Sequence, residues 1–156
     1  MGSEYHCYGS DITCSYPANG KFTAEQNDIY SAVLAAQKAV YSKLKPGVSW
    51  VDMHLTAELA SLTVLKERGY LQGDLDEMQK QRVGALFQPH GLGHLLGIDT
   101  HDVGGYGEHF PERLTEAGLK KLRTSRIVEK GKRNSLSTII TLPPLINALT
   151  CLLSHS

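Results

Sequence analysis

The chain has 156 residues, and its 16 basic side chains balance 16 acidic ones, so it carries no net charge. This length fits one domain with a sizeable core. A balanced charge excludes the basic surface that nucleic acid or an anionic membrane would need, so we expect recognition at a local site. Cys7, Cys14 and Cys151 are too few for a disulfide framework, and the first residues lack the pattern of a secretory signal. These features predict a cytoplasmic protein.

The N-terminal residues are rich in side chains that favour β-structure. Residues 4–8 and 11–16 are predicted as two short strands joined at Gly9-Ser10, and the turn residues at 17–20 close the pair. A strand that begins so close to Met1 leaves an edge without a partner. We therefore expect that sequence is missing upstream.

Two long amphipathic helices are predicted next. Thr23 and Gln26 have the form of a capping box, and apolar residues then repeat at helical spacing up to Leu44. Ser49 with Asp52 begins a second helix, which ends near a glycine suited to a C-terminal cap, Gly69. His54 lies in this second helix with no polar partner in view, and it is interpreted as an ordinary surface or packed histidine.

Shorter elements are predicted in the second half of the chain. Residues 74–81 have the composition of a short helix, and residues 83–87 read as a strand. Residues 116–122 are predicted to form one or two helical turns, and residues 123–128 a further strand. Strands, two helices and then strands make an α+β fold.

Residues 89–105 are the most unusual stretch, because they hold three of the seven histidines and five glycines. His90 and His94 have the spacing of a zinc-protease helix. However, Gly91 and Gly93 would each cost such a helix about 1 kcal/mol, and the glutamate expected after the first histidine is absent. A loop followed by a strand is the better prediction, with His94 pointing to one face of a sheet.

A lone histidine is usually an ordinary polar residue, but a group of histidines among glycines favours a functional site. Imidazole suits both metal ligation and proton transfer near neutral pH, so both roles are open from the residues themselves. Arg123 and Arg126, in a polar run further on, would without other information be interpreted as solvated charges.

The stretch from His90 to Tyr106 resembles the histidine motif of the prolidase family, the Xaa-Pro dipeptidases among the pita-bread metallopeptidases. The resemblance extends upstream through the run Ser-Asp-Ile-Thr-Cys-Ser-Tyr-Pro at 10–17 and downstream through Leu-Arg-Thr at 122–124, and it covers roughly residues 1–131. It implies an incomplete pita-bread fold of the α+β class, with an antiparallel sheet and two long helices. The implied activity is hydrolysis of dipeptides with a C-terminal proline.

The resemblance also implies roles for individual residues. The family binds two manganese ions through two aspartates, one histidine and two glutamates, and such oxygen-rich ligation suits manganese. Asp11 matches the second aspartate and His94 matches the histidine ligand. His90 and His101 match the catalytic histidines. Arg123 matches the arginine that, together with His101, binds the carboxylate of the C-terminal proline.

The sequence also departs from the family pattern at the remaining ligands. The first metal aspartate should directly precede Met1, and Lys132-Arg133-Asn134-Ser135 stands where a Thr-x-Glu-Pro-Gly strand should follow. The last glutamate has no counterpart. With three of five ligands missing, the resemblance implies at most weak binding of a single ion, and a chain that is inactive alone.

Residues 132–156 are predicted to be a separate tail, unrelated to the peptidase-like region at 1–131. Positions 134–154 carry no charge and are rich in apolar and hydroxyl side chains. Pro143-Pro144 interrupts them, so a membrane anchor is not favoured and poor packing is expected.

Three functional hypotheses remain. In the first, the chain is part of a manganese-dependent Xaa-Pro dipeptidase. In the second, it is a non-catalytic fragment, either a partner in a homodimer or with the full-length enzyme, or an unstable product. In the third, it is a pita-bread binding module that has lost its metal, similar to the peptidase-like domains of histone chaperones. The presence of Asp11, His90, His94, His101 and Arg123 argues against the third, because a module without metal has no chemical need for them.

Overall fold

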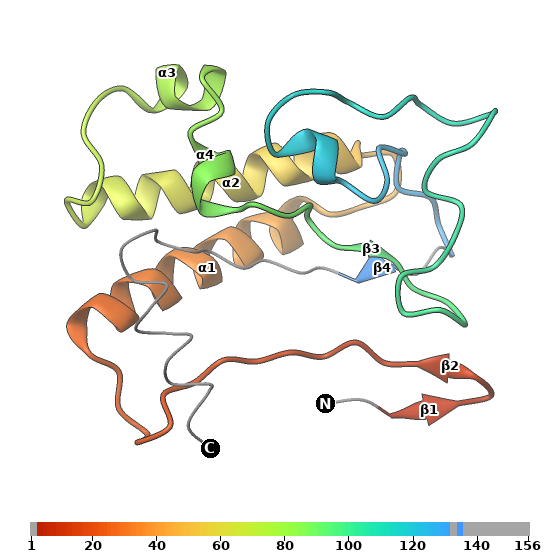
Figure 1. Cartoon of the computed structure of the whole chain (residues 1–156), viewed down its shortest axis with the longest axis horizontal. Helices are drawn as coiled ribbons and strands as arrows, with labels where there is room; N and C mark the ends of the chain where they lie inside the picture. Colours follow the sequence, from red (N-terminus) through yellow and green to blue (C-terminus); the bar gives the residue numbers. More distant parts are fainter. Residues whose placement is uncertain (1–2, 132–133, 136–156) are drawn as a thin grey trace.

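The computed structural model describes residues 3–131 and 134–135. Figure 1 shows two long helices, α1 (Ala24–Lys43) and α2 (Trp50–Glu67), that run side by side in opposite directions. The N-terminal residues run as an extended segment along α1, and the histidine stretch lies between that segment and α2 (Figure 1). The helices therefore form the support on which the extended segments meet.

Both long helices begin and end where local chemistry predicts. At the start of α1, the Thr23 side chain accepts from the backbone N–H of Gln26, and the Gln26 side chain accepts from that of Thr23. Ser49 caps α2. Gly69 follows α2 at φ 82°, a left-handed conformation that glycine adopts without steric cost. The predicted helices and caps are confirmed.

The core lies along the α1–α2 contact and consists of two clusters. The first joins the N-terminal half of α1 to the C-terminal half of α2; its buried members are Ile29, Ala32, Leu62, Leu65, Met78 and Phe87. The second joins the opposite halves to the segments that carry the candidate site; its buried members are Ala36, Val40, Trp50, Met53, Ala57, Leu92, Leu119 and Leu122. Through Leu92 and Leu122, the second cluster holds the histidine stretch and the Arg123 segment against the helices.

The segments after α2 are short. The predicted helix at 74–81 is confirmed as α3 (Leu75–Lys80), and the helical turn expected within 116–122 is the 3-10 turn η1 (Leu119–Lys121). The strand predicted at 83–87 is wrong, because these residues form a helical turn, α4 (Gly84–Phe87). The apolar side chains at 83–87 are compatible with a strand as well as with a helical turn. The turn buries Phe87 in the first cluster, and the Gly84 backbone packs so closely on Glu58 that an added Cβ would lie 2.9 Å from its Cδ.

The N-terminal hairpin also differs from its prediction. Strands β1 (Glu4–Tyr5) and β2 (Tyr8–Gly9) pair antiparallel, so the chain reverses at His6-Cys7 and not at Gly9-Ser10. Both turn residues have positive φ, 51° and 67°, and such turns match the twist of paired strands although glycine usually fills them. The prediction placed the reversal at the glycine, and the strand it placed at 11–16 is wrong, because these residues form no regular secondary structure.

Strand β3 (His94–Leu95) pairs antiparallel with β4 (Asn134–Ser135), and His94 lies opposite Ser135. Ile127 forms an isolated antiparallel bridge with Ser49, so the strand expected at 123–128 is reduced to one bridge. The fold is α+β, as predicted. Within the described ranges, no helix is long and apolar enough to cross a membrane. The predictions for the tail at 136–156 lie outside the described residues.

Candidate metal and substrate site

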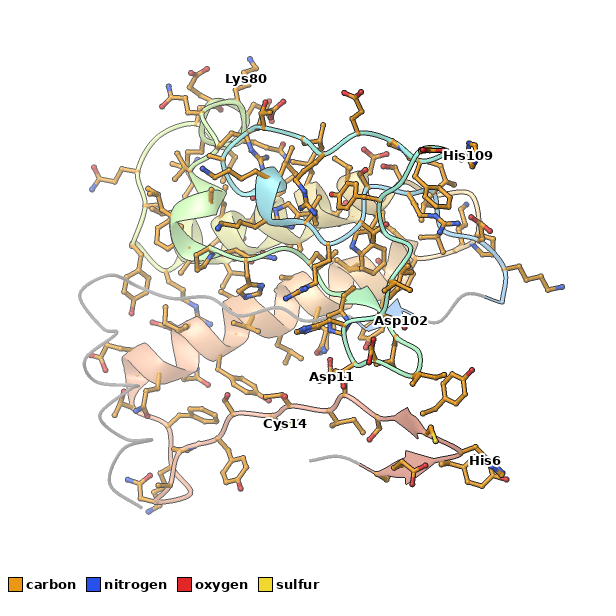
Figure 2. The ribbon with its side chains drawn as sticks, turned by 45° about the vertical axis from the view of Figure 1, so that its right-hand side comes forward. His6, Asp11, Cys14, Lys80, Asp102 and His109 are labelled. Carbon is orange, nitrogen blue, oxygen red and sulfur yellow. The ribbon has the colours of Figure 1, made fainter. Side chains whose placement is uncertain are left out.

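The central contact of the candidate site joins two residues that are far apart in the sequence. Asp11 follows β2 on the extended N-terminal segment, and His94 begins β3. His94 Nε2 lies 3.0 Å from Asp11 Oδ2. His94 is buried, whereas the Asp11 side chain is partly exposed. Figure 2 shows Asp11 on the N-terminal segment, below the loop that carries Asp102. The fold thus brings together the two residues that the family resemblance implies as metal ligands.

The hydrogen bonds of His94 suit a metal ligand. Its Nδ1 lies 2.9 Å from the carbonyl oxygen of Leu95, and because a carbonyl only accepts, Nδ1 carries the proton. A carboxylate also only accepts, so the 3.0 Å contact with Asp11 is a hydrogen bond only when Nε2 is protonated as well; in the neutral ring, Nε2 offers its lone pair to a cation. Metal-bound histidines have this arrangement, with one nitrogen donating to a carbonyl and the other facing the cation. The donor types of Asp11 and His94 therefore fit one divalent ion.

The other donors of a two-metal site are not gathered here. Within the described part of the chain, no group of three or more His, Cys, Asp or Glu residues is placed to hold an ion. Asp11 and His94 alone leave most coordination positions of a cation to water.

His101 lies next to His94. Their ring centroids are 4.3 Å apart and the rings are nearly perpendicular. Partial desolvation lowers the pKa of His101 from its usual value, the nearby His94 and the positive charge of Arg123 lower this pKa further, and Asp11 opposes them. His101 is nevertheless exposed. The pattern of charges places Asp11, His94, His101 and Arg123 within electrostatic reach of one another.

His90 and Arg123 lie on the segments that flank this contact. His90 Nδ1 is 2.8 Å from the carbonyl oxygen of Gly91, whereas its buried Nε2 has no hydrogen-bond partner among the described residues. Arg123 follows η1, and its side chain is exposed. An unpartnered ring nitrogen and an exposed guanidinium are both free to meet a substrate.

Glycines of the histidine stretch allow the Arg123 segment to lie directly against it. A Cβ added at Gly91 would be 2.7 Å from the Cα of Leu122, and one added at Gly105 would collide with the carbonyl oxygen of Arg123. Real Cβ atoms are not found at such distances. Gly91 and Gly105 are therefore required because any side chain at these positions would push the Arg123 segment away from the histidine stretch.

The sequence prediction missed a buried ionic group near α4. His54 and Glu58 are fully buried on α2, and His54 Nε2 lies 3.0 Å from Glu58 Oε1. Arg82 binds the same carboxylate through Nη1 to Oε2, 2.8 Å, and through Nη2 to Oε1, 3.0 Å. His54 was expected to be a surface or packed histidine, and it is packed. The expectation that it has no polar partner is wrong. Its i,i+4 spacing from Glu58 was the available signal.

Comparisons with known proteins show to which family the chain belongs. The sequence profile of metallopeptidase family M24 matches residues 1–141. The chain is 55% identical to human Xaa-Pro dipeptidase over 131 residues, which are 84% of this chain and 26% of that protein. It is 50% identical over 105 residues, 67% of this chain and 23% of the relative, to the probable Xaa-Pro aminopeptidase pepP of Botryotinia fuckeliana (strain B05.10). The chain thus spans about a quarter of the length of these relatives.

Solved structures show the same fold. Pseudomonas aeruginosa aminopeptidase PepP superposes with a TM-score of 0.73 at 34% identity, over 90% of this chain and 29% of that one. Zinc-substituted Escherichia coli aminopeptidase P in complex with product superposes with a TM-score of 0.64 at 28% identity, over 98% of this chain and 40% of the other.

The helix pair and the extended segments have the pita-bread fold of these aminopeptidase P structures. The chain belongs to metallopeptidase family M24, and within it the chain is similar to the Xaa-Pro dipeptidases.

Proposed function

We propose that residues 1–131 carry part of the active site of a manganese-dependent Xaa-Pro dipeptidase, which cleaves dipeptides with a C-terminal proline. In this proposal Asp11 and His94 are metal ligands, and His90 and His101 are catalytic. The observation that carries it is the 3.0 Å contact between Asp11 and His94, which joins positions 83 residues apart. The 55% identity to human Xaa-Pro dipeptidase supports the substrate class.

Arg123, together with His101, is proposed to bind the substrate carboxylate. A guanidinium presents paired N–H donors that match the two oxygens of a carboxylate, which gives direction as well as charge. The bound metal pair would supply a nucleophilic water and polarise the scissile carbonyl. His90 Nδ1 donates to the Gly91 carbonyl, so the Nε2 of the neutral ring, which has no partner among the described residues, is proposed to accept a hydrogen bond from the substrate.

The chain by itself is proposed to be inactive and to bind at most one ion weakly. One carboxylate and one imidazole cannot hold two cations at the spacing that two-metal hydrolysis needs. Each 1.36 kcal/mol of lost transition-state stabilisation lowers the rate about tenfold, so loss of the metal pair should remove measurable turnover. His101 and Arg123 would still bind a dipeptide, but binding the ground state alone does not accelerate hydrolysis.

The test combines metal binding with turnover. Free Mn²⁺ is followed by electron paramagnetic resonance during titration of the purified chain, the Asp11→Ala/His94→Ala double variant, and a His109→Ala control. His109 is an exposed histidine on a distant part of the loop (Figure 2). We expect weak binding that the double variant loses and the control keeps. Equal Mn²⁺ binding by all three proteins would refute the ligand assignment.

Turnover is measured on the same proteins with glycyl-proline and excess Mn²⁺. We expect none. Manganese-dependent hydrolysis that disappears in the double variant would show that a partner chain supplies the remaining ligands, and would overturn the inactivity. Light scattering at assay concentration then tests the proposed homodimer, and mixing with the full-length enzyme tests the other proposed partner.

The cytoplasm remains the proposed compartment. Cys7 and Cys14 are both exposed and free in the structure, which suits a reducing environment.

A further inference from the structure

The carbonyl group of Leu122, immediately before Arg123, is held by two side chains from the preceding loop. The Tyr106 hydroxyl donates to it at 3.0 Å, and Arg113 Nη1 donates to it at 2.6 Å. The Arg113 guanidinium also lies over the Tyr106 ring, 4.1 Å from its centroid. Tyr106 and Arg113 thus form one unit, with a cation–π contact between them and a shared acceptor.

The same unit extends to the turn before Arg123. Arg113 Nη1 also lies 3.2 Å from the carbonyl oxygen of Lys120, so one guanidinium nitrogen contacts both ends of this short segment. The backbone N–H of Leu122 donates to Leu119 at 2.9 Å, and the Leu122 side chain is fully buried. The residue before Arg123 is therefore fixed through its N–H, its carbonyl and its side chain.

Arg123 itself is fixed on its other side by backbone contact. Its carbonyl oxygen packs against Gly105, which directly precedes Tyr106 and has no Cβ to separate the two chains. The backbone of Arg123 is thus enclosed by the loop that begins with His101, whereas its side chain is exposed. Small shifts of Tyr106 or Arg113 would move the Leu122 carbonyl, and with it the backbone from which the Arg123 side chain extends.

We propose that Tyr106 and Arg113 are positioning residues that aim the Arg123 guanidinium, and that they thereby set the preference for a substrate with a free C-terminal carboxylate. This inference rests on the proposed role of Arg123. A bidentate guanidinium–carboxylate pair needs a defined direction, so a displaced backbone weakens it. A neutral C-terminal amide does not form this charged pair, so its binding is expected to change little.

The test compares two probes, glycyl-L-proline and glycyl-L-prolinamide, on the full chain by saturation-transfer NMR titration. The wild-type chain should prefer the acid. Tyr106→Phe keeps the ring beneath Arg113 but removes the hydroxyl, and it should lower the preference about fivefold, the effect of one hydrogen bond. Arg113→Lys removes the planar donor and should lower the preference at least as much.

Matched controls exist at the far end of the helix pair. The Tyr70 hydroxyl donates to Asp28 at 3.3 Å, and Arg68 pairs with the same carboxylate at 3.3 Å. Tyr70→Phe and Arg68→Lys remove the same chemical groups away from Arg123, and they should leave the preference unchanged.

Each outcome decides between the two proposals. Equal binding of both probes by the wild-type chain overturns the carboxylate role of Arg123 and this inference with it. A preference that Arg123→Ala abolishes, but that Tyr106→Phe and Arg113→Lys leave intact, overturns the positioning role alone. Loss of affinity for both probes by the same factor assigns Tyr106 and Arg113 to packing and likewise overturns it.

Discussion

Replacing Arg82 with Met should destabilise this protein more than any loss of a surface ion pair. Arg82 forms two charged hydrogen bonds to Glu58, at 2.8 and 3.0 Å, and a third bond from Nε to the carbonyl oxygen of Ala117 at 3.1 Å. Its side chain is 11% exposed and that of Glu58 is 1% exposed. Without Arg82, the buried Glu58 carboxylate would keep only His54 as a partner among the described side chains.

The size of the effect follows from this burial. Removing one partner of a buried ion pair costs about 3–5 kcal/mol, because the remaining charge stays without water and without compensation. The exposed pair of Arg68 with Asp28 is the comparison, since Arg68 is 48% exposed and such pairs contribute about 1 kcal/mol or less. Arg82→Met and Arg68→Met remove the same group at the two positions.

Urea unfolding followed by circular dichroism measures both changes. The free energy of unfolding should fall by about 3–5 kcal/mol for Arg82→Met and by less than about 1 kcal/mol for Arg68→Met. Adding Glu58→Gln to Arg82→Met should recover part of the loss, because the unpaired charge is then gone. Equal effects of the two arginine substitutions, or no recovery in the double variant, would refute the argument from burial.

Three further predictions concern the site and its surroundings. Gly91→Ala, whose new Cβ would lie 2.7 Å from the Leu122 backbone, should lower the unfolding free energy by about 1–3 kcal/mol. Gly9→Ala should cost less, because its nearest contact among the described residues is Thr100 Oγ1 at 4.0 Å; urea unfolding compares the two variants. Because the pKa of His101 lies below its usual 6.5, its contribution to the stability of the fold is present above pH 6.5 and is lost as the pH falls below that value. Arg123→Ala removes a positive charge that lowers this pKa, so the pKa of His101 should rise in an NMR titration. An unchanged pKa would contradict the proximity of the two side chains. Limited proteolysis should cleave residues 132–156 before the helix at 24–43; equal resistance would show that the tail is a true structural element.

Local sequence was sufficient for the helix pair. The capping box at Thr23, the serine cap at Ser49 and the glycine after α2 act within a few residues of the backbone groups they satisfy, so their effect is visible in the sequence. The apolar spacing of both helices predicted the faces that meet in the core.

Local sequence failed where two structures fit the same residues. The apolar run at 83–87 suits a strand or a helical turn, and the close packing of Gly84 on Glu58 is compatible with the turn. At the N-terminus, the prediction relied on the conformational freedom of Gly9. The structure reverses instead at His6-Cys7, where paired strands on both sides hold two residues at positive φ.

In the candidate site too, the sequence predicted some features and the tertiary structure decided others. The sequence by itself predicted the residues of the site, because the histidines and glycines at 90–105 form an unusual cluster, and their resemblance to a known motif extended the predicted set to Asp11 and Arg123. Tertiary structure decided that Asp11 meets His94 and that Tyr106 and Arg113 both donate to the carbonyl of Leu122, the residue before Arg123. It also decided that the buried carboxylate of Glu58 contacts both His54 and Arg82. The reason is that hydrogen bonds and charges act over a few ångströms of space, and only the packing of α1, α2 and the extended segments brings these distant positions within that range.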